Sequence, residues 1–333
     1  MGEYLFWACV DGCGCDAVSV ITQDIKAVAA ALKRGECVAI PTETVYGLAA
    51  LASRADAIAK VFALKQRPLT HSLIVHVAAS FDISTLTSVI PEYAKQLMDA
   101  FWPGPLTLVL PRRPGCVLDS VTGGQDTVAL RSPAHPLAQA ILEAVGEPLV
   151  APSANPFGKV SPTTAQHVQD SFEDADLLIL DGGRCEVGIE STIVSATDPH
   201  GYHILRPGLI DEVLLSQVLA QPVSQPSAFL PRVSGQLKDH YQPEKPLRCF
   251  ETHEALMQAY QQTSNKPYVL SFSTAFKPGF LLQNTPAKVA YELYYQLRLA
   301  DALEIQEIWV ELPPQTPVWQ GVRDRLLKAS KKY

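Results

Sequence analysis

The sequence contains no apolar run near the roughly 18–20 residues that a membrane-spanning helix needs. Its first fifteen residues include no lysine or arginine, so they lack the basic segment that opens a secretory signal. Lysine and arginine number 27 against 34 acidic residues, whereas a protein that binds duplex nucleic acid usually carries a basic footprint. These absences predict a cytoplasmic protein with no membrane partner, and they disfavour bulk binding of nucleic acid.

Cysteine is scarce, and its seven copies stand at positions 9, 13, 15, 37, 116, 185 and 249. An odd, scattered set is typical of reduced thiols rather than of a disulfide framework. The group Cys9, Cys13 and Cys15 has no fourth cysteine or histidine nearby, because the first histidine is His71. Structural zinc normally takes four closely spaced ligands, so we expect no metal site here.

The length of 333 residues suits two domains, and the predicted elements alternate between helix and strand. Thr22 is the expected N-cap of a first helix that stops at Gly35. Apolar periodicity predicts further helices near 56–65, 91–101, 136–145, 163–170 and 211–220. It predicts strands near 36–40, 72–77, 106–110, 127–131, 148–153, 177–181, 191–195 and 203–206. This mixed order favours a twisted mixed sheet with flanking helices, in the α/β class.

Proline marks a change of character between residues 216 and 246. Five prolines, at 222, 226, 231, 243 and 246, break every periodic pattern and predict an extended linker. Strands near 267–272 and 305–311 and helices near 286–299 and 318–330 follow it and predict a small Rossmann-like domain. We therefore divide the chain into an extension (1–20), a first domain (21–215), a linker (216–246) and a second domain (247–333). The second domain has no G-x-G-x-x-G, so dinucleotide binding is not supported there.

The stretch IPTETVYGLA, residues 40–49, places Thr42, Glu43, Thr44 and Tyr46 directly after a buried strand. A surface turn does not require so many side-chain donors and acceptors, whereas a binding site at the end of a strand does. Both interpretations fit the local pattern, and the remaining motifs favour the second.

Cations and polar side chains follow other predicted elements in the same way. Lys65 and Arg67 stand two positions apart after a helix, and Ser153 and Asn155 do so after a strand. Ser161 shortly precedes a helix, whose first N–H groups would be free. Taken singly, such pairs are more often surface or turn residues. Together they predict a phosphate site, which is not a Walker loop because G-x-x-x-x-G-K-[ST] is absent.

Three more polar residues end strands or lie within them. Arg131 ends the strand TVALR and could clamp a carboxylate, although an ordinary surface ion pair is an equal alternative. Arg206 ends the strand HILR. His76 lies inside LIVHV, where a core histidine bonded to a backbone carbonyl is the favoured interpretation.

Six motifs in order resemble the YrdC-like domain of L-threonylcarbamoyladenylate synthases. They are GECVAIPTETVYGLAA, KQRPLTHSLIVHV, FWPGPLTLVL, VALRSPAHP, PLVAPSANPFGKVSPTTAQHV and GIESTIVSATDPHGYHILRPG. The segments SGQLKDHYQPEKPL and IWVELPPQTPVWQGVRDRLLKASKK resemble the linker and the C-terminal end of two-domain members. The sequence departs from the family pattern at Gln66, where glycine is common, and at Pro156-Phe157, where a small polar residue is usual.

The resemblance implies an enzyme that makes threonylcarbamoyl-AMP from L-threonine, bicarbonate or CO2, and ATP, with release of pyrophosphate. It implies Mg2+ carried on the ATP phosphates, downstream threonylcarbamoyl transferase proteins that modify tRNA beside the anticodon, and at most a weak contact with tRNA itself. The implied nucleotide-binding residues are Lys65, Arg67, Ser153, Asn155, Ser161, Arg206 and His240, with Lys65 and Arg67 also catalytic. The implied threonine-binding residues are Thr42, Thr44, Tyr46, His76 and Arg131.

Two other functions fit the same fold. One is the carbamoyl-adenylate step of hydrogenase maturation, but the acylphosphatase-like and zinc-finger segments of those proteins are missing here. The other is a binding module for double-stranded RNA or the ribosome, against which the net charge of −7 speaks. Threonine-dependent release of pyrophosphate without RNA would separate an enzyme from a binding module.

Overall fold

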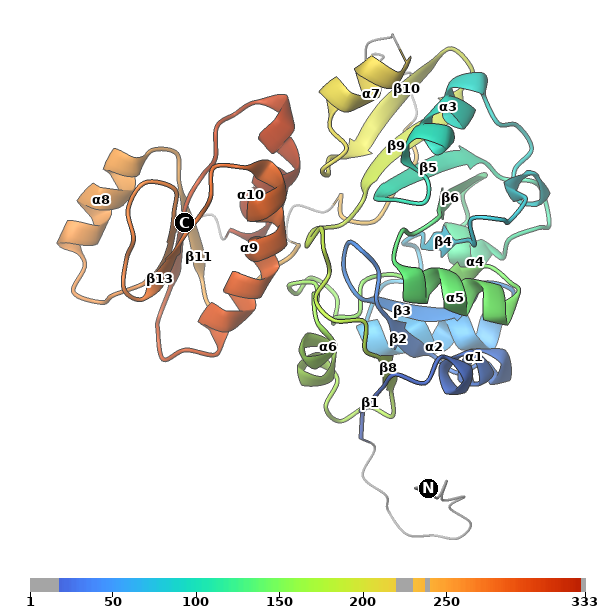
Figure 1. Ribbon diagram of the computed structural model, residues 1–333, viewed down its shortest axis with the longest axis horizontal. Helices are drawn as coiled ribbons and strands as arrows, with labels where there is room; N and C mark the ends of the chain where they lie inside the picture. The colour runs from blue at the N-terminus through green and yellow to red at the C-terminus, as the bar shows by residue number, and fades with distance from the viewer. Residues whose placement is uncertain (1–17, 220–229, 237–239, 331–333) are drawn as a thin grey trace, which may run out of the picture.

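The computed structural model describes residues 18–219, 230–236 and 240–330 (Figure 1). Cys9, Cys13 and Cys15 and parts of the linker lie outside the described residues. The described residues form two α/β units, each built on a sheet of its own. The expected boundaries at 21–215, 216–246 and 247–333 stay a prediction, with which the two sheets are compatible.

The strands of the first unit are β1 (Val20–Thr22), β2 (Val38–Ile40), β3 (Gly47–Leu51), β4 (Ile74–His76), β5 (Leu106–Pro111), β6 (Thr127–Arg131), β7 (Leu149–Val150), β8 (Leu178–Leu180), β9 (Thr192–Asp198) and β10 (Gly201–Arg206). Its helices are α1 (Ile25–Arg34), α2 (Ala55–Lys65), α3 (Glu92–Phe101), α4 (Asp119–Thr122), α5 (Pro136–Val145), α6 (Ala165–Ser171) and α7 (Glu212–Leu219), with a 3-10 turn at Ile83–Thr85.

The large sheet has the order β1-β8-β2-β3-β7-β4-β6-β5-β9-β10 and mixes parallel with antiparallel pairs. β4 and β6 run parallel, with His76 opposite Arg131. β2 and β3 form an antiparallel hairpin whose connection is residues 41–46. The expected mixed sheet is confirmed, and its register brings several predicted site residues onto neighbouring strand ends.

Helices cover both faces of this sheet. Alternate residues of a strand point to opposite faces, so a strand that is apolar throughout must be covered on both sides. Val38 and Ile40 of β2 pack with α1 and α5, whereas Ala39 between them packs into the core formed with α2 and α3. Both faces of the strand are therefore apolar, as a central strand requires.

The second unit has β11 (Leu247–Phe250), β12 (Tyr268–Ser271), β13 (Gly279–Leu281) and β14 (Ile308–Glu311), all parallel, in the order β11-β14-β12-β13. Its helices are α8 (His253–Gln262), α9 (Pro286–Asp301) and α10 (Gln320–Ala329), preceded by a 3-10 turn at Pro317–Trp319. In Figure 1 α9 and α10 lie between this sheet and the first unit, and α8 lies on the far side. The expected small parallel α/β domain is confirmed.

One expected helix boundary is wrong. The N-cap of α1 is Asp24, whose carboxylate accepts hydrogen bonds from the N–H groups of Lys26 and Ala27. Thr22 instead ends β1, and its hydroxyl accepts from the N–H of Asp24. An aspartate two residues further on competes successfully for the capping position, because its carboxylate bonds two free helical donors at once.

No helix among the described residues is long and apolar enough to cross a membrane.

Candidate functional site

A cavity of about 40 Å³ lies where strand ends of the large sheet meet the linker. The residues that form it come from positions between 44 and 241 of the chain, so the fold brings distant motifs together. Seven predicted site residues line it: Thr44, Arg67, His76, Arg131, Ser153, Arg206 and His240. Glu190, Ser191 and Ser234 also line it and were not predicted, as does Tyr241, which belongs with His240 to the linker segment that resembles the family's.

Three buried cations gather around this cavity: Arg67 and Arg206 line it, and Lys65 lies behind its lining. Lys65, Arg67 and Arg206 are exposed by only 2%, 6% and 3%, and none of them forms an ion pair with a carboxylate in the described part of the chain. Burial, and then the charge of Arg67, holds the pKa of Lys65 well below its usual value. Burial, and then Arg206, lowers the pKa of Arg67 to about 10. Buried cations are costly unless a counter-charge accompanies them, so this cluster is suited to a polyanion.

The K-x-R pair is oriented by the residue between its two cations. Gln66 ends α2 in the left-handed conformation, with φ of 52°. The side chain of Lys65 donates to the carbonyls of Ser153 and Asn155 at 2.5 and 2.7 Å. Arg67 donates to the carbonyl of Ser72 at 2.9 Å and lies at the cavity. The sharp turn at Gln66 thus directs both cations toward the same cavity. Arg67 lines it, whereas Lys65 lies behind the segment that carries Ser153 and Asn155.

The side-chain amide of Asn155 closes that loop. Its Nδ2 donates to the carbonyls of Pro156 and Lys159 at 2.7 and 3.0 Å. Its Oδ1 is buried with no hydrogen-bond partner among the described residues. Asn155 does not line the cavity itself, so its immediate effect is to shape the segment that carries Ser153.

Arg131 already has a carboxylate partner in the structure. Its Nη2 donates to Oε1 of Glu43 at 2.7 Å, and both side chains are about nineteen-twentieths buried. Its Nε donates to the carbonyl of Gly104 at 3.2 Å, and Oε2 of Glu43 accepts from the N–H of Ala134 at 3.0 Å. The pair is therefore fixed rather than exposed, which excludes the surface alternative for Arg131. Glu43 belongs to the stretch 40–49, but nothing in the sequence indicated its partner.

The polar residues of the stretch 40–49 have different places: one lines the cavity and the others hold the turn beside it. The hydroxyl of Thr42 donates to the carbonyl of Val45 at 2.6 Å and lies 2.9 Å from that of Thr44. Thr44 lines the cavity, whereas Thr42 closes the hairpin turn beside it. Tyr46 points elsewhere, because its hydroxyl donates to the carbonyl of Gly183 and accepts from the N–H of Gly182. The structure thus brings one of these three predicted residues directly to the cavity.

Two histidines at the cavity are neutral. Burial, and then Arg131, lowers the pKa of His76 to about 3, and its Nδ1 lies 3.2 Å from the carbonyl of Ile74. Burial also lowers the pKa of His240 to about 3. The imidazole of His240 packs against the rings of Phe157 and Tyr241, with centroids 5.8 and 4.1 Å away.

The expected phosphate contact through Ser161 and its helix stays a prediction, and the hydroxyl of Ser161 has a protein partner in this structure. The hydroxyl of Ser161 donates to Oε1 of Glu190 at 2.5 Å and does not line the cavity. α6 begins at Ala165 and is capped by Thr164, whose hydroxyl accepts from the N–H of His167. A capped helix start is a poorer anion site than the free one that the sequence suggested.

Linker residues close the cavity from outside. The hydroxyl of Ser234 lies 3.5 Å from Arg67, and its carbonyl accepts from Arg206 at 3.3 Å. The carbonyl of Gly235 accepts from Lys328 of α10 at 2.7 Å. Tyr241 adopts the left-handed conformation, with φ of 64°. The cavity itself is far smaller than the usual small-molecule site of about 300–1,000 Å³, and a neighbouring cavity of about 240 Å³ shares Arg67, Ser72 and His240 with it.

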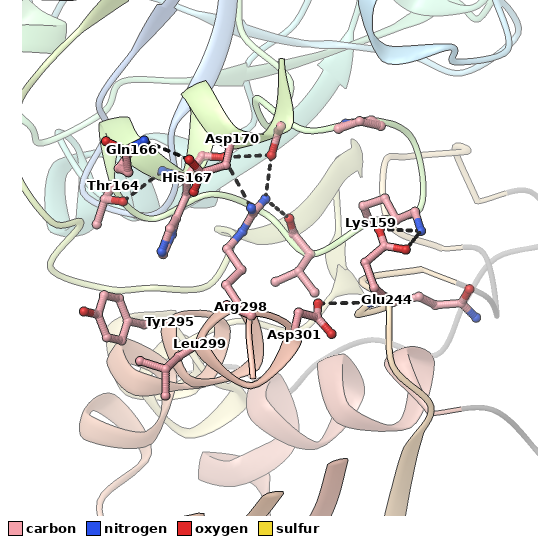
Figure 2. A pocket seen from close by; sticks show the side chains of 15 residues that line it. Lys159, Thr164, Gln166, His167, Asp170, Glu244, Tyr295, Arg298, Leu299 and Asp301 are labelled. Carbon is pink, nitrogen blue, oxygen red and sulfur yellow. Dashed lines mark hydrogen bonds and ion pairs between the residues drawn. The ribbon is translucent and has the colours of Figure 1, made fainter. Parts of the chain in front are cut away.

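A larger cavity of about 760 Å³ lies between α6 and α9 but contains none of the predicted site residues. Figure 2 shows Arg298 extending from α9 toward α6, with Lys159 and Glu244 paired to one side. Its lining mixes acids and bases, and Arg298 donates to the carbonyl of Val160 at 2.6 Å. We interpret this cavity as part of the seam between the two units, and we place the candidate site at the smaller, basic cavity.

A broad mixed sheet with buried cations that lack carboxylate partners among the described residues, joined to a small parallel α/β unit, indicates a two-unit α/β protein with a site for an anion. The family model Sua5_yciO_yrdC, described as telomere recombination, matches residues 30–208. The model for the C-terminal domain of threonylcarbamoyl-AMP synthase matches residues 209–331. The chain belongs to the threonylcarbamoyl-AMP synthase family.

Individual relatives agree over nearly the full length. The chain is 38% identical to threonylcarbamoyl-AMP synthase of Bacillus subtilis, over 95% of each chain. It is 35% identical to that of Pyrococcus abyssi, over 92% of this chain and 94% of the relative. The solved structure of P. abyssi Sua5 complexed with L-threonine matches with a TM-score of 0.82 and 32% identity, covering 94% of this chain and 97% of that one.

Proposed function

We propose that this enzyme forms threonylcarbamoyl-AMP from L-threonine, bicarbonate or CO2, and ATP, and releases pyrophosphate. The observation that carries the proposal is the cluster of Lys65, Arg67 and Arg206, three buried cations without carboxylate partners in the described residues. A triphosphate supplies the missing negative charge. The solved relative bound to L-threonine supports threonine as the second substrate.

The proposed reaction has two steps. The threonine amine adds to CO2 and loses a proton, which gives a carbamate. A carbamate oxygen then attacks the α-phosphorus of ATP, and the bond to the pyrophosphate oxygen breaks. Because negative charge builds on the phosphoryl oxygens, catalysis is mostly positioning and charge stabilisation, which Lys65, Arg67 and Arg206 supply.

The proposed reaction is tested by incubating the protein with ATP, Mg2+, bicarbonate and one amino acid at a time. We expect pyrophosphate release with L-threonine in the absence of RNA. No threonine-dependent pyrophosphate from folded protein would refute the proposed function.

Threonine recognition needs a cation for the carboxylate and polar partners for the hydroxyl and amine. We propose that the paired Arg131 and the neutral His76 line this pocket together with Thr44, because all three border the cavity. In this proposal Thr42 and Tyr46 shape the hairpin behind it. A buried polar group left unpaired by a poor substrate costs about 1–3 kcal/mol.

We therefore expect 2-aminobutyrate, which lacks the threonine hydroxyl, to react with kcat/KM about tenfold to a hundredfold below that of L-threonine. Serine, which keeps the hydroxyl but lacks the methyl group, is the matched comparison. Pyrophosphate release over a range of amino-acid concentrations measures all three. Equal kcat/KM for threonine and 2-aminobutyrate would contradict recognition of the hydroxyl.

The lowered pKa of Lys65 predicts how ATP binding depends on pH. Phosphates next to Lys65 favour its charged form, so its pKa rises when ATP binds. Between the two pKa values the complex holds more protons than the free enzyme, so binding takes up a proton and affinity falls as pH rises. Calorimetry of ATP binding in buffers of different ionisation enthalpy measures this uptake. Lys65→Met should abolish it, and an unchanged uptake in that variant would exclude Lys65 as its source.

Because ATP usually reacts as its Mg2+ complex, the residues that could hold the metal ion need to be identified. The described residues contain no group of three or more histidine, cysteine or acidic side chains that could hold an ion. The two carboxylates at the site, Glu43 and Glu190, are engaged by Arg131 and Arg325. We propose that Mg2+ enters on the ATP phosphates, where it neutralises charge, while the protein's own cations position the phosphates.

The wider setting is also proposed. We expect the product to pass to threonylcarbamoyl transferase proteins that modify tRNA, with at most a weak contact between this enzyme and tRNA. The free cysteines at positions 37, 116, 185 and 249 fit the reducing cytoplasm. We further propose that the linker around Ser234 and His240 covers the site, which would protect a water-labile product.

A further inference from the structure

The C-terminal domain sends one fully buried arginine into the catalytic domain. Arg325 of α10 is exposed by 0%, and its Nε donates to Oε2 of Glu190 at 2.7 Å. Its Nη1 donates to the carbonyl of Pro207 at 2.9 Å. Tyr294 of α9 donates its hydroxyl to the same Oε2 at 2.9 Å. One oxygen of Glu190 is thus held entirely by the second domain.

The two domains meet closely at this point. A Cβ on Gly188 would lie 2.3 Å from the carbonyl oxygen of Ala290 in α9. A Cβ on Gly321 of α10 would lie 2.6 Å from the carbonyl oxygen of Gly208. Only glycine allows the backbones to approach so closely, and this approach is what lets Arg325 span the interface. A second arginine, Arg298 of α9, donates a hydrogen bond to the carbonyl of Val160 (Figure 2). Val160 immediately precedes Ser161.

Glu190 lies where a negative charge would weaken phosphate binding. It lines the central cavity with Arg67 and Arg206, and it interacts electrostatically with both Arg206 and Lys65. Burial alone would raise the pKa of Glu190, but Arg325 and then Arg206 outweigh it, and the pKa falls to about 2. Glu190 is therefore negatively charged. Without Arg325 it would keep its hydrogen bonds from Ser161 and Tyr294, and the positive charges left to interact with it would include Arg206 and Lys65.

We propose that Arg325, with help from Tyr294, is a positioning residue of the nucleotide site: it holds Glu190 so that this carboxylate does not neutralise Lys65, Arg67 and Arg206. The C-terminal domain is then a part of the ATP site, although Arg325 does not line the cavity. This inference rests on the proposed function, because it takes the triphosphate of ATP as the anion that the cations receive.

The test compares ATP affinity in Arg325→Met and in the double variant Arg325→Met/Glu190→Gln. The single change frees the charge of Glu190 among the cations, where buried charges interact strongly, so we expect the Kd for Mg-ATP to rise about tenfold or more. The double change removes the competing charge, so we expect the Kd to return to within about threefold of the wild-type value. A purely structural role for Arg325 would lower the unfolding temperature of the single variant and leave the Kd for Mg-ATP of its folded form unchanged.

Arg323→Met is the matched control. Arg323 lies on the same helix and is similarly buried, but its hydrogen bonds go to Pro313 and Glu251 within the C-terminal domain. We expect it to leave the Kd for Mg-ATP unchanged. An equal weakening in Arg323→Met and Arg325→Met would overturn the proposal, as would a double variant no better than the single one.

A milder variant guards against misfolding of Arg325→Met. Tyr294→Phe removes one hydrogen bond to Glu190 and keeps the arginine, so we expect a Kd about twofold to fivefold higher. Calorimetry with Mg-ATP measures every Kd, and thermal unfolding confirms that each variant is folded. Wild-type pyrophosphate release is measured in parallel: its absence would refute the proposed function, whereas normal release with unchanged ATP affinity in Tyr294→Phe and Arg325→Met would refute only the role of Arg325.

Discussion

Replacing Lys65 with alanine should lower threonine-dependent pyrophosphate release about a hundredfold to a thousandfold, the usual cost of removing one preorganised donor from a transition state. The change removes a buried charge beside Arg67 and two hydrogen bonds that fix the loop of Ser153 and Asn155. Both losses act on the phosphate site. The rate at saturating ATP and threonine is the measurement.

Lys60→Ala is the control for this variant. Lys60 lies on the same helix, α2, but is exposed, and it donates only to the carbonyl of Gly35 at 2.8 Å. Its loss should leave the rate within about twofold of wild type, as is usual for surface substitutions. A Lys65→Ala enzyme that works at the Lys60→Ala rate would remove Lys65 from the mechanism.

Arg131→Met should destabilise the protein by about 3–5 kcal/mol, because it leaves the carboxylate of Glu43 buried without its counter-charge. In a domain of this size such a loss lowers the Tm by on the order of 10 °C. Thermal unfolding measures it directly. The double variant Arg131→Met/Glu43→Gln should recover most of the loss, because no uncompensated charge remains.

Asp119→Asn is the matched exposed case. Asp119 pairs with Arg112 at 2.6 Å, but its own side chain is 80% exposed. Breaking such a pair should cost at most about 1 kcal/mol. If Arg131→Met were no more harmful than Asp119→Asn, burial of the Arg131–Glu43 pair could not be what stabilises this hairpin.

Local signals in the sequence predict many of the elements well. β6 occupies residues 127–131 and α5 occupies residues 136–145, as expected. β-branched residues favour a strand through their own conformational preferences. A proline at the first position of a helix and a glycine after its last position mark its two ends. Each of these signals involves only a few neighbouring positions. Sequence patterns of this kind do not depend on what packs against them.

Other elements depend on tertiary packing and were missed. β3 has the sequence GLAAL, which favours strand only weakly, and it forms because β2 and β7 pair with it on both sides. The partner of Glu190, Arg325, stands 135 positions away. The motif that contains Glu190 was noted, but only the docked C-terminal domain reveals what holds its side chain.

The sequence likewise could not predict which side chains of the stretch 40–49 point into the cavity. Thr44 and Tyr46 are two residues apart in one hairpin connection, yet only Thr44 borders the cavity. Tyr46 turns toward Gly182 and Gly183, far along the chain. The motif marked the region of the site correctly, and the choice between its residues depended on contacts with distant segments.

The small volume of the central cavity has a kinetic consequence. If the linker covers the site as proposed, a nucleotide enters only after the contacts of Ser234 with Arg67 and Arg206 break, so the frequency of that opening sets the rate of capture. Association is then gated and slower than a collision-limited encounter. Escape is governed by the same gate, so a bound intermediate would persist through many collisions with solvent.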